Sequence, residues 1–198
     1  MLRSFLLLAV LGSFVCAEEA GVTALKKQLT TAVASMTADD KVKAFVTANL
    51  LPLTTDATWV AEVAAQNSKA VSLDEIKKLD TQWQKAEEEL PIQKEKLGNA
   101  CAKACMAVAK RLPALREIFV MDNQGANVGQ SSLTSDYWQG DEDKWAKSFN
   151  GGKGGVDVGK VKFDQSANVS LQQVSLPIIA ADGAVIGAVC FGIDVGAL

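Results

Sequence analysis

The sequence contains no histidine among its 198 residues. This absence excludes the Ser-His-Asp and Cys-His catalytic arrangements, zinc held by histidine, and the attachment of c-type haem. A strong excess of basic residues is also missing, since 20 Lys and Arg face 23 Asp and Glu for a net charge of −3. A mildly acidic chain has no electrostatic reason to bind nucleic acid or an anionic membrane. We therefore expect no metal, no cofactor and no nucleic-acid partner.

Long hydrophobic runs are confined to the first segment. A positive start at residues 1–3 precedes the apolar run 5–11, and small residues at 15–17 come before Glu18. This layout is typical of a secretory signal peptide, so residues 1–17 are expected to be cleaved after Ala17. The run is shorter than the roughly 20 residues that a spanning helix needs, although a retained anchor remains the alternative. We expect a periplasmic or secreted protein.

Cysteine is scarce once the signal peptide is removed, leaving Cys101, Cys105 and Cys190. Residues four apart on a helix share a face at about 6 Å, so Cys101 and Cys105 have a separation that a disulfide tolerates. In an oxidising compartment such a bridge would persist. The alternative is that both are small apolar residues in a helix interface.

The region 18–90 is predicted to be helical. Val22, Leu25, Leu29, Ala32 and Met36 recur at three and four residues, and this apolar stripe would suit a partner helix in a homodimer. Further helices are expected to start after Asp56, at the capping box Ser72–Glu75, and at Pro91, the last of them running to Lys110.

After Leu115 the hydrophobic period changes from about 3.6 to 2. The predicted strands are residues 118–121, 126–129, 156–163, 169–179 and 184–195. A turn at Asp182-Gly183 joins the last two. The fold class is therefore α+β, with N-terminal helices packed on a five-stranded antiparallel sheet.

The last predicted strand has one face of small residues, among them Ala188, Cys190, Gly192 and Asp194. The room above them would be filled either by a ligand, with Asp194 at the rim of its cavity, or by a closely approaching helix.

Several segments in order carry a family resemblance: Ile118-Phe119-Val120-Met121-Asp122-Asn123-Gln124-Gly125, Thr134-Ser135-Asp136-Tyr137-Trp138, Val174-Ser175-Leu176-Pro177-Ile178 and Asp182-Gly183-Ala184-Val185-Ile186-Gly187. This set resembles the extracytoplasmic Cache sensor domains, which are PAS-like. The resemblance implies a sensor domain over residues 91–198, with a long helix behind the sheet. It also implies a small metabolite, such as an organic acid, an amino acid or an amine, between the sheet and the loops over its other face.

The resemblance also implies which residues meet the ligand. The segment Asp136, Tyr137 and Trp138 matches the one that covers the family's pocket, and Phe163, Asp164 and Asp194 match strand ends beside it. Trp145 completes the predicted site. The alternative is that Trp138 and Trp145 are core residues and Asp136 is a helix cap.

The charge of the ligand stays open at this point. Tyr137 stands where many amino-acid-binding members carry an arginine. Lys153, Lys160 or Lys162 would be replacement cations for a carboxylate, whereas the aspartates and aromatic rings favour a cationic or neutral ligand.

We expect an exported, non-catalytic sensor module that acts through a separate membrane receptor or kinase, because no output module follows before Leu198. The alternative is a structural or interaction protein that assembles through its helical half without a ligand. Catalysis by Asp141-Glu142-Asp143 is not expected, because consecutive acids point in different directions and usually form a solvated face.

Overall fold

A computed structural model describes residues 4–164 and 169–198, with side chains from Glu19 to Phe163 and from 169 onward. The α-helices are α1 (Ser4–Ser35), α2 (Asp40–Phe45), α3 (Ala57–Ser68), α4 (Leu73–Gln84), α5 (Pro91–Gly98), α6 (Ala100–Arg111) and α7 (Asp143–Phe149). The strands are β1 (Leu115–Met121), β2 (Asn127–Gln130), β3 (Asp157–Val158), β4 (Lys162–Asp164), β5 (Val169–Ile179) and β6 (Val185–Asp194).

The strands form one antiparallel sheet in the order β2-β1-β6-β5-β3, and β4 also pairs with β5. The predicted α+β class is confirmed. One predicted strand, 156–163, is instead divided into β3 and β4. Between the two strands, Gly159 still donates its N–H to Gln173 O of β5 at 2.8 Å, but its carbonyl accepts from the Gln172 side chain at 3.0 Å.

The main core lies on one face of the sheet, beneath α1, α3 and α6. Its largest side chains include Trp59 of α3 and Phe191 of β6, whose ring centroids lie 6.1 Å apart. Leu29 and Val33 of α1 and Met36, which directly follows this helix, are buried in the same core. The stripe predicted to serve a homodimer is therefore occupied largely within the chain, and dimerisation stays a prediction.

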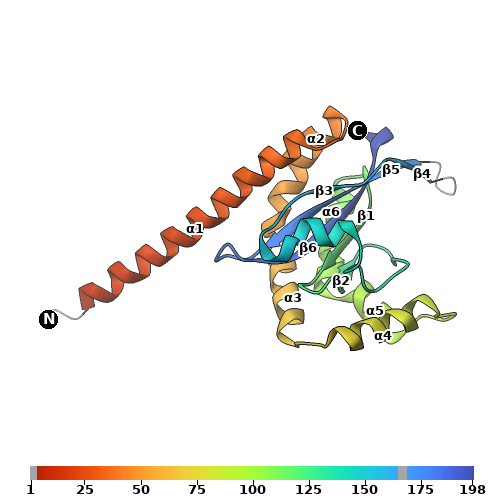
Figure 1. Cartoon of the computed structure of the whole chain (residues 1–198), viewed down its shortest axis with the longest axis horizontal. Helices are drawn as coiled ribbons and strands as arrows, with labels where there is room; N and C mark the ends of the chain where they lie inside the picture. Colours follow the sequence, from red (N-terminus) through yellow and green to blue (C-terminus); the bar gives the residue numbers. More distant parts are fainter. Residues whose placement is uncertain (1–3, 165–168) are drawn as a thin grey trace.

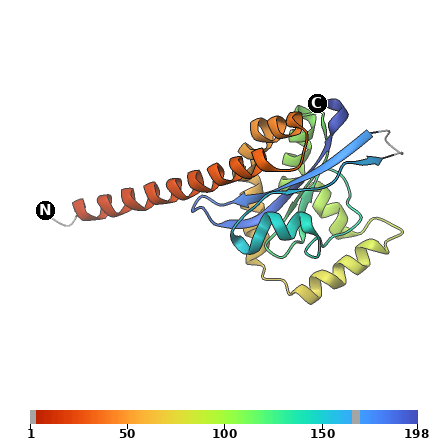
Figure 2. The same cartoon turned by 45° about the horizontal axis from the view of Figure 1, so that its top comes forward.

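The N-terminal half of α1 projects away from the rest of the molecule (Figures 1 and 2). The helix is continuous across the predicted cleavage point after Ala17, and cleavage itself stays a prediction. Within the part of the chain that the structure describes, no helix combines the length and apolar character needed to cross a membrane.

The predicted helix starts at Asp56 and Ser72 are confirmed. Asp56 Oδ1 accepts the N–H groups of Thr58 and Trp59 at 3.0 Å, and Ser72 Oγ accepts that of Glu75 at 3.3 Å. These bonds satisfy amides that the first helical turn leaves without partners.

The long helix predicted from Pro91 to Lys110 is wrong, because the chain breaks into α5 and α6 at Asn99. Asn99 is extended, with ψ of 179°, and its side-chain oxygen accepts the N–H of Ala102 at 2.8 Å. Its amide nitrogen donates to Val128 O of β2 at 2.7 Å. The side chain thus caps the second helix and ties it to the sheet edge.

Candidate functional site

The second face of the sheet is covered by α7, which lies on the side away from α6 (Figure 1). Trp145 and Phe149 of α7 stack with ring centroids 5.1 Å apart and pack against Phe119, Met121, Ala188 and Cys190. The helix thus fills the room above part of the small face of β6. Beside it, toward β3 and β4, a cavity of about 590 Å³ remains.

The floor of this cavity is polar and spans three strands. Glu117 of β1 and Gln173 of β5 both lie opposite Gly192 of the intervening β6 in the strand register. The Gln173 amide donates to Glu117 Oε1 at 2.7 Å. A side chain on Gly192 would occupy the space of the Glu117 side chain, since a Cβ there would lie 2.4 Å from Glu117 Cγ.

The α7 side of the cavity carries ion pairs. Lys144 Nζ lies 2.9 Å from Glu142, and Lys147 Nζ lies 2.8 Å from Asp143 and 3.4 Å from Asp157. The hydrogen bond to Asp143 raises the pKa of Lys147. The carboxylates of Glu142, Asp143 and Asp157 are therefore each paired with a lysine of α7.

Glu117 differs from these carboxylates. Among the described residues, no lysine or arginine forms a salt bridge with it. Its half-buried position and single amide partner leave a negative charge available to a ligand on the cavity floor. A positively charged group placed there would gain a charge-assisted hydrogen bond.

The outer wall is formed by the β3–β4 segment. Lys160, Lys162 and Phe163 line it, and Phe163 is 60% exposed. Two of the lysines that the sequence offered as replacement cations are thus on this cavity, whereas Lys153 is not among its lining residues. The cavity presents an anion on its floor and cations on its outer wall.

The predicted segment Asp136–Trp138 lies elsewhere, against α4 and α5. Tyr137 is buried with Ile76 and Trp83, and its ring centroid is 5.6 Å from that of Trp83. Burial, with the nearby carboxylates of Asp122 and Glu95, raises the pKa of Tyr137. None of the three segment residues lines the cavity beneath α7.

Hydrogen bonds between side chains and backbone hold the segment Asp136–Trp138 in place. Asp80 Oδ1 of α4 accepts the N–H groups of Tyr137 and Trp138 at 2.8 and 3.0 Å. The indole of Trp138 donates to Gln124 O at 2.8 Å, and the backbone oxygen of Asp136 accepts from Asn127. Direct contact of the segment with a ligand stays a prediction.

The remaining predicted site residues are dispersed. Asp194 is buried and pairs with Arg116, whose Nη2 lies 2.7 Å from Oδ2, and it also caps the turn at Gly196. The indole of Trp145 donates to Asp122 O at 2.9 Å. The side chain of Asp164 is outside the described residues. Of the seven predicted site residues, Phe163 lines the cavity.

Cys101, Cys105 and Cys190 are free and buried. A hydrogen bond with Cys105, together with burial, raises the pKa of Cys101. Burial raises the pKa of Cys190 to about 12. Neutral thiols of this kind are unreactive unless they become exposed. Among the described residues, no cluster of His, Cys, Asp and Glu is arranged to hold a metal ion.

Glu117 and Gln173 were missed as site residues by the sequence analysis. Alternation along β1 would have placed Glu117 on the same face as Phe119 and Met121. The sequence therefore did contain a signal for Glu117, namely a charged residue on the same face of the first strand as large apolar residues. The contact with Gln173 depends on strand order, which alternation does not give.

No family model and no curated protein match this sequence. Solved structures that resemble it include the sensor domain of the V. cholerae histidine kinase DctB, with a TM-score of 0.44 and 10% identity over 88% of this chain and 55% of that one. The ligand-binding domain of the Pseudomonas aeruginosa chemoreceptor PctC, in complex with GABA, has a TM-score of 0.39 and 12% identity over 74% and 61%.

The ligand-binding domain of the Campylobacter jejuni chemoreceptor Tlp3, in complex with 4-methylisoleucine, has a TM-score of 0.40 and 15% identity over 90% of this chain and 60% of that one. This chain thus spans 55% to 61% of the length of the three. All three are sensor or ligand-binding domains of a histidine kinase or of chemoreceptors. At this distance they assign no role to any residue of this chain.

Proposed function

We propose that the protein is an exported, non-catalytic sensor module that binds a small zwitterionic metabolite in the cavity beneath α7. The observation that carries this proposal is the carboxylate of Glu117 on the cavity floor, which accepts from Gln173 but has no ion-pair partner among the described residues, with Lys160 and Lys162 on the outer wall. An ammonium group would bind Glu117, and a carboxylate would be attracted to the lysines.

The size and composition of the cavity agree with this ligand class. A volume of about 590 Å³ lies within the range of roughly 300–1,000 Å³ usual for small-molecule sites. Phe163 and Leu171 supply apolar contacts beside the charged groups, which would suit a short side chain. Amino acids fit this description, whereas a purely anionic organic acid would give the Glu117 carboxylate no positively charged partner.

The proposal includes an action through another protein. The site is formed by α7, β3 and β4 together, so a ligand would tie an edge of the sheet to a seven-residue helix. A change in the exposed surface of this edge is what a separate membrane receptor or kinase would detect. Residence in the periplasm or outside the cell is part of the same proposal.

Thermal unfolding in the presence of candidate ligands tests the proposal. The panel contains neutral amino acids, short primary amines and dicarboxylic acids, each at the same ionic strength. Binding to the folded state adds about 2.7 kcal/mol of stability at 100 times the dissociation constant, so the melting temperature should rise with an amino acid. The assignment would be overturned if the melting temperature rose only with dicarboxylic acids, or if no compound in the panel raised it.

A further inference from the structure

One asparagine in the chain is followed by glycine, and this pair, Asn150-Gly151, lies at the C-terminal end of α7. Asn150 has the left-handed conformation, with φ of 51° and ψ of 46°, and is exposed. Gly151 is also exposed and has a φ of 58°, and a side chain there would meet nothing within 4 Å. Solvent therefore reaches the junction of the two residues, and glycine permits rotation about it.

An asparagine followed by glycine has an intramolecular reaction available. The Gly151 nitrogen, once it has lost its proton to hydroxide, attacks Cγ of Asn150, and the Cγ–Nδ2 bond breaks with loss of ammonia. Water then opens the cyclic imide. Breakage of the new N–Cγ bond gives aspartate, whereas breakage of the bond to the main-chain carbonyl gives isoaspartate, whose main chain is longer by one methylene. Glycine favours the attack because no side chain shields its nitrogen.

Asn123 provides a comparison within the chain. It is exposed and lies in the turn between β1 and β2, but the residue after it is Gln124. The Gln124 N–H donates to Asp122 Oδ1 at 2.8 Å. Loss of the proton from this nitrogen would place an anion beside a carboxylate, which is unfavourable. Asn123 is therefore exposed without being reactive, and Asn150 differs from it in the residue that follows.

The loop that follows Asn150 is closed back onto α7. Gly154 donates its N–H to Phe149 O at 3.1 Å, and the Asn150 side chain donates from Nδ2 to Gly154 O at 3.3 Å. Gly155 packs so closely on the helix that a Cβ there would lie 2.5 Å from Lys147 O. A loop this short and this tightly bonded has no room for an additional main-chain atom.

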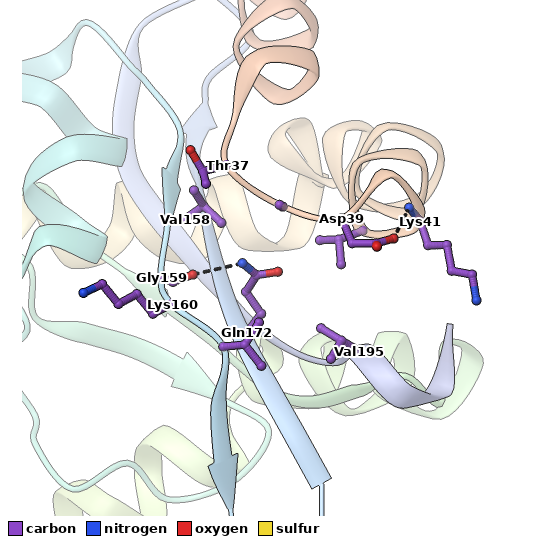
Figure 3. A pocket seen from close by; sticks show the side chains of 11 residues that line it. Thr37, Asp39, Lys41, Val158, Gly159, Lys160, Gln172 and Val195 are labelled. Atoms are coloured by element: carbon purple, nitrogen blue, oxygen red, sulfur yellow. Dashed lines mark hydrogen bonds between the residues drawn. The ribbon is translucent and has the colours of Figure 1, made fainter.

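The far end of the loop is held by the sheet. Asp157 and Val158 of β3 pair with β5. Gly159 donates to Gln173 O at 2.8 Å and accepts from the Gln172 side chain at 3.0 Å. Figure 3 shows the bond between Gln172 and Gly159 at the wall of a second cavity. Because β3 is fixed to β5 in this way, a change in the length of the loop has to be taken up at its other end, in α7.

From this arrangement we infer that Asn150 is a modification site, converted without an enzyme to aspartate and isoaspartate, and that the isoaspartate form releases the C-terminal end of α7. Both products lose the amide that donates to Gly154 O. Both also place a negative charge at a helix C-terminus, where the helix dipole is already negative. The inference goes beyond the proposed function, because the reaction needs only this chain and water.

Peptide mapping by mass spectrometry, on folded protein stored in a mildly alkaline buffer, tests the modification. The peptide with Asn150 should gain the mass of an amide-to-acid exchange, whereas Asn123 should stay unmodified. Methylation by an isoaspartate methyltransferase identifies the isoaspartate form. Asn150→Gly is the control, because glycine suits the left-handed backbone and has no side chain to react, so it should show neither change.

Amide hydrogen exchange tests the release of α7. The modified protein is separated from the unmodified protein by its added charge, and is compared with freshly prepared Asn150→Asp, which has the same charge but a normal main chain. Amides at the C-terminal end of α7 should exchange faster in the modified protein than in Asn150→Asp, whereas amides of β6 should exchange equally in both.

Three results would overturn the inference. An Asn150 that stays intact, or conversion of Asn123 to the same extent, would contradict the modification site. Equal exchange of α7 in the modified protein and in Asn150→Asp would contradict the release of the helix. None of these results concerns a ligand, so failure of this inference and failure of the proposed function are distinguishable.

Discussion

The Gln173 amide reaches across a whole strand to donate to the Glu117 carboxylate at 2.7 Å. The two residues belong to β5 and β1, which are separated by β6, and both lie opposite Gly192 in the strand register. Because Gly192 has no side chain, the two polar groups meet above it. This contact sets the position of the Glu117 carboxylate on the cavity floor.

Replacing Glu117 by glutamine should weaken the binding of a zwitterionic ligand by about tenfold or more. The variant keeps the size of the side chain but loses the charge that would hold an ammonium group, and hydrogen bonds to charged groups are worth about 1.5–3 kcal/mol. Isothermal titration calorimetry with the ligand found by thermal unfolding measures the change. Glu75→Gln on exposed α4 is the matched control, and an equal affinity of both variants would exclude the Glu117 contact.

Gly192→Ala should weaken binding without unfolding the protein. The new Cβ would lie 2.4 Å from Glu117 Cγ, so the flexible glutamate side chain must move and its bond to Gln173 is lost. We expect a cost in stability of about 1 kcal/mol, the usual contribution of one hydrogen bond. Gly98→Ala, where a Cβ meets nothing within 4 Å, is the control. Unchanged ligand affinity in Gly192→Ala would contradict the arrangement of the floor.

Tyr137→Ala should lower the free energy of unfolding by about 3–5 kcal/mol, as for other large buried aromatic side chains. The ring packs against Trp83 and Ile76, at the contact between α4 and the sheet edge. Urea denaturation measures the loss. Tyr137→Phe retains the ring and should lose much less. A fully stable alanine variant that no longer binds ligand would instead assign Tyr137 to the ligand site.

Cys190 should make the protein less stable at alkaline pH. Its pKa is about 12 when folded, against an ordinary value of 9.0, so the unfolded chain loses its proton first. The contribution of Cys190 to the free energy of unfolding should therefore be constant below pH 9 and fall between pH 9 and 12, by at most about 1.4 kcal/mol per pH unit.

Urea denaturation at several pH values, compared between the wild type and Cys190→Ala, isolates this contribution. The alanine variant should start from a lower stability but lose less of it as the pH rises. Parallel pH profiles for the two proteins would show that the Cys190 thiol does not titrate as the structure indicates.

The cysteine pair gives a separate prediction. Cys101 and Cys105 are free in the structure and buried, so neither should react with a thiol reagent in the folded protein at neutral pH. In denatured, unreduced protein both should react. Two missing thiols in that titration, recovered after reduction, would show that the Cys101–Cys105 bridge forms.

Local signals in the sequence predicted the parts of the fold that neighbouring residues determine. Caps at Asp56 and Ser72 and the turn at Asp182-Gly183 depend on residues within a few positions, and they occur as predicted. The break at Asn99 did not follow from the sequence, because its amide bonds to Val128, 29 residues away.

The site was harder to predict for the same reason. Tyr137 and Trp138 look like pocket residues in the sequence, but Asp80 of α4 binds their backbone and places them against that helix. The meeting of Glu117 with Gln173 depends on β6 lying between their strands, which follows from the topology of the whole sheet.

Amide spectra of the ¹⁵N-labelled protein with a mixture of neutral L-amino acids test the central claim most directly. Binding beneath α7 predicts saturable shifts at Gln173, Gly192 and Lys144 that are lost in Glu117→Gln. Shifts grouped instead around Asp80, Tyr137 and Trp138, or no saturable shift at all, would contradict it.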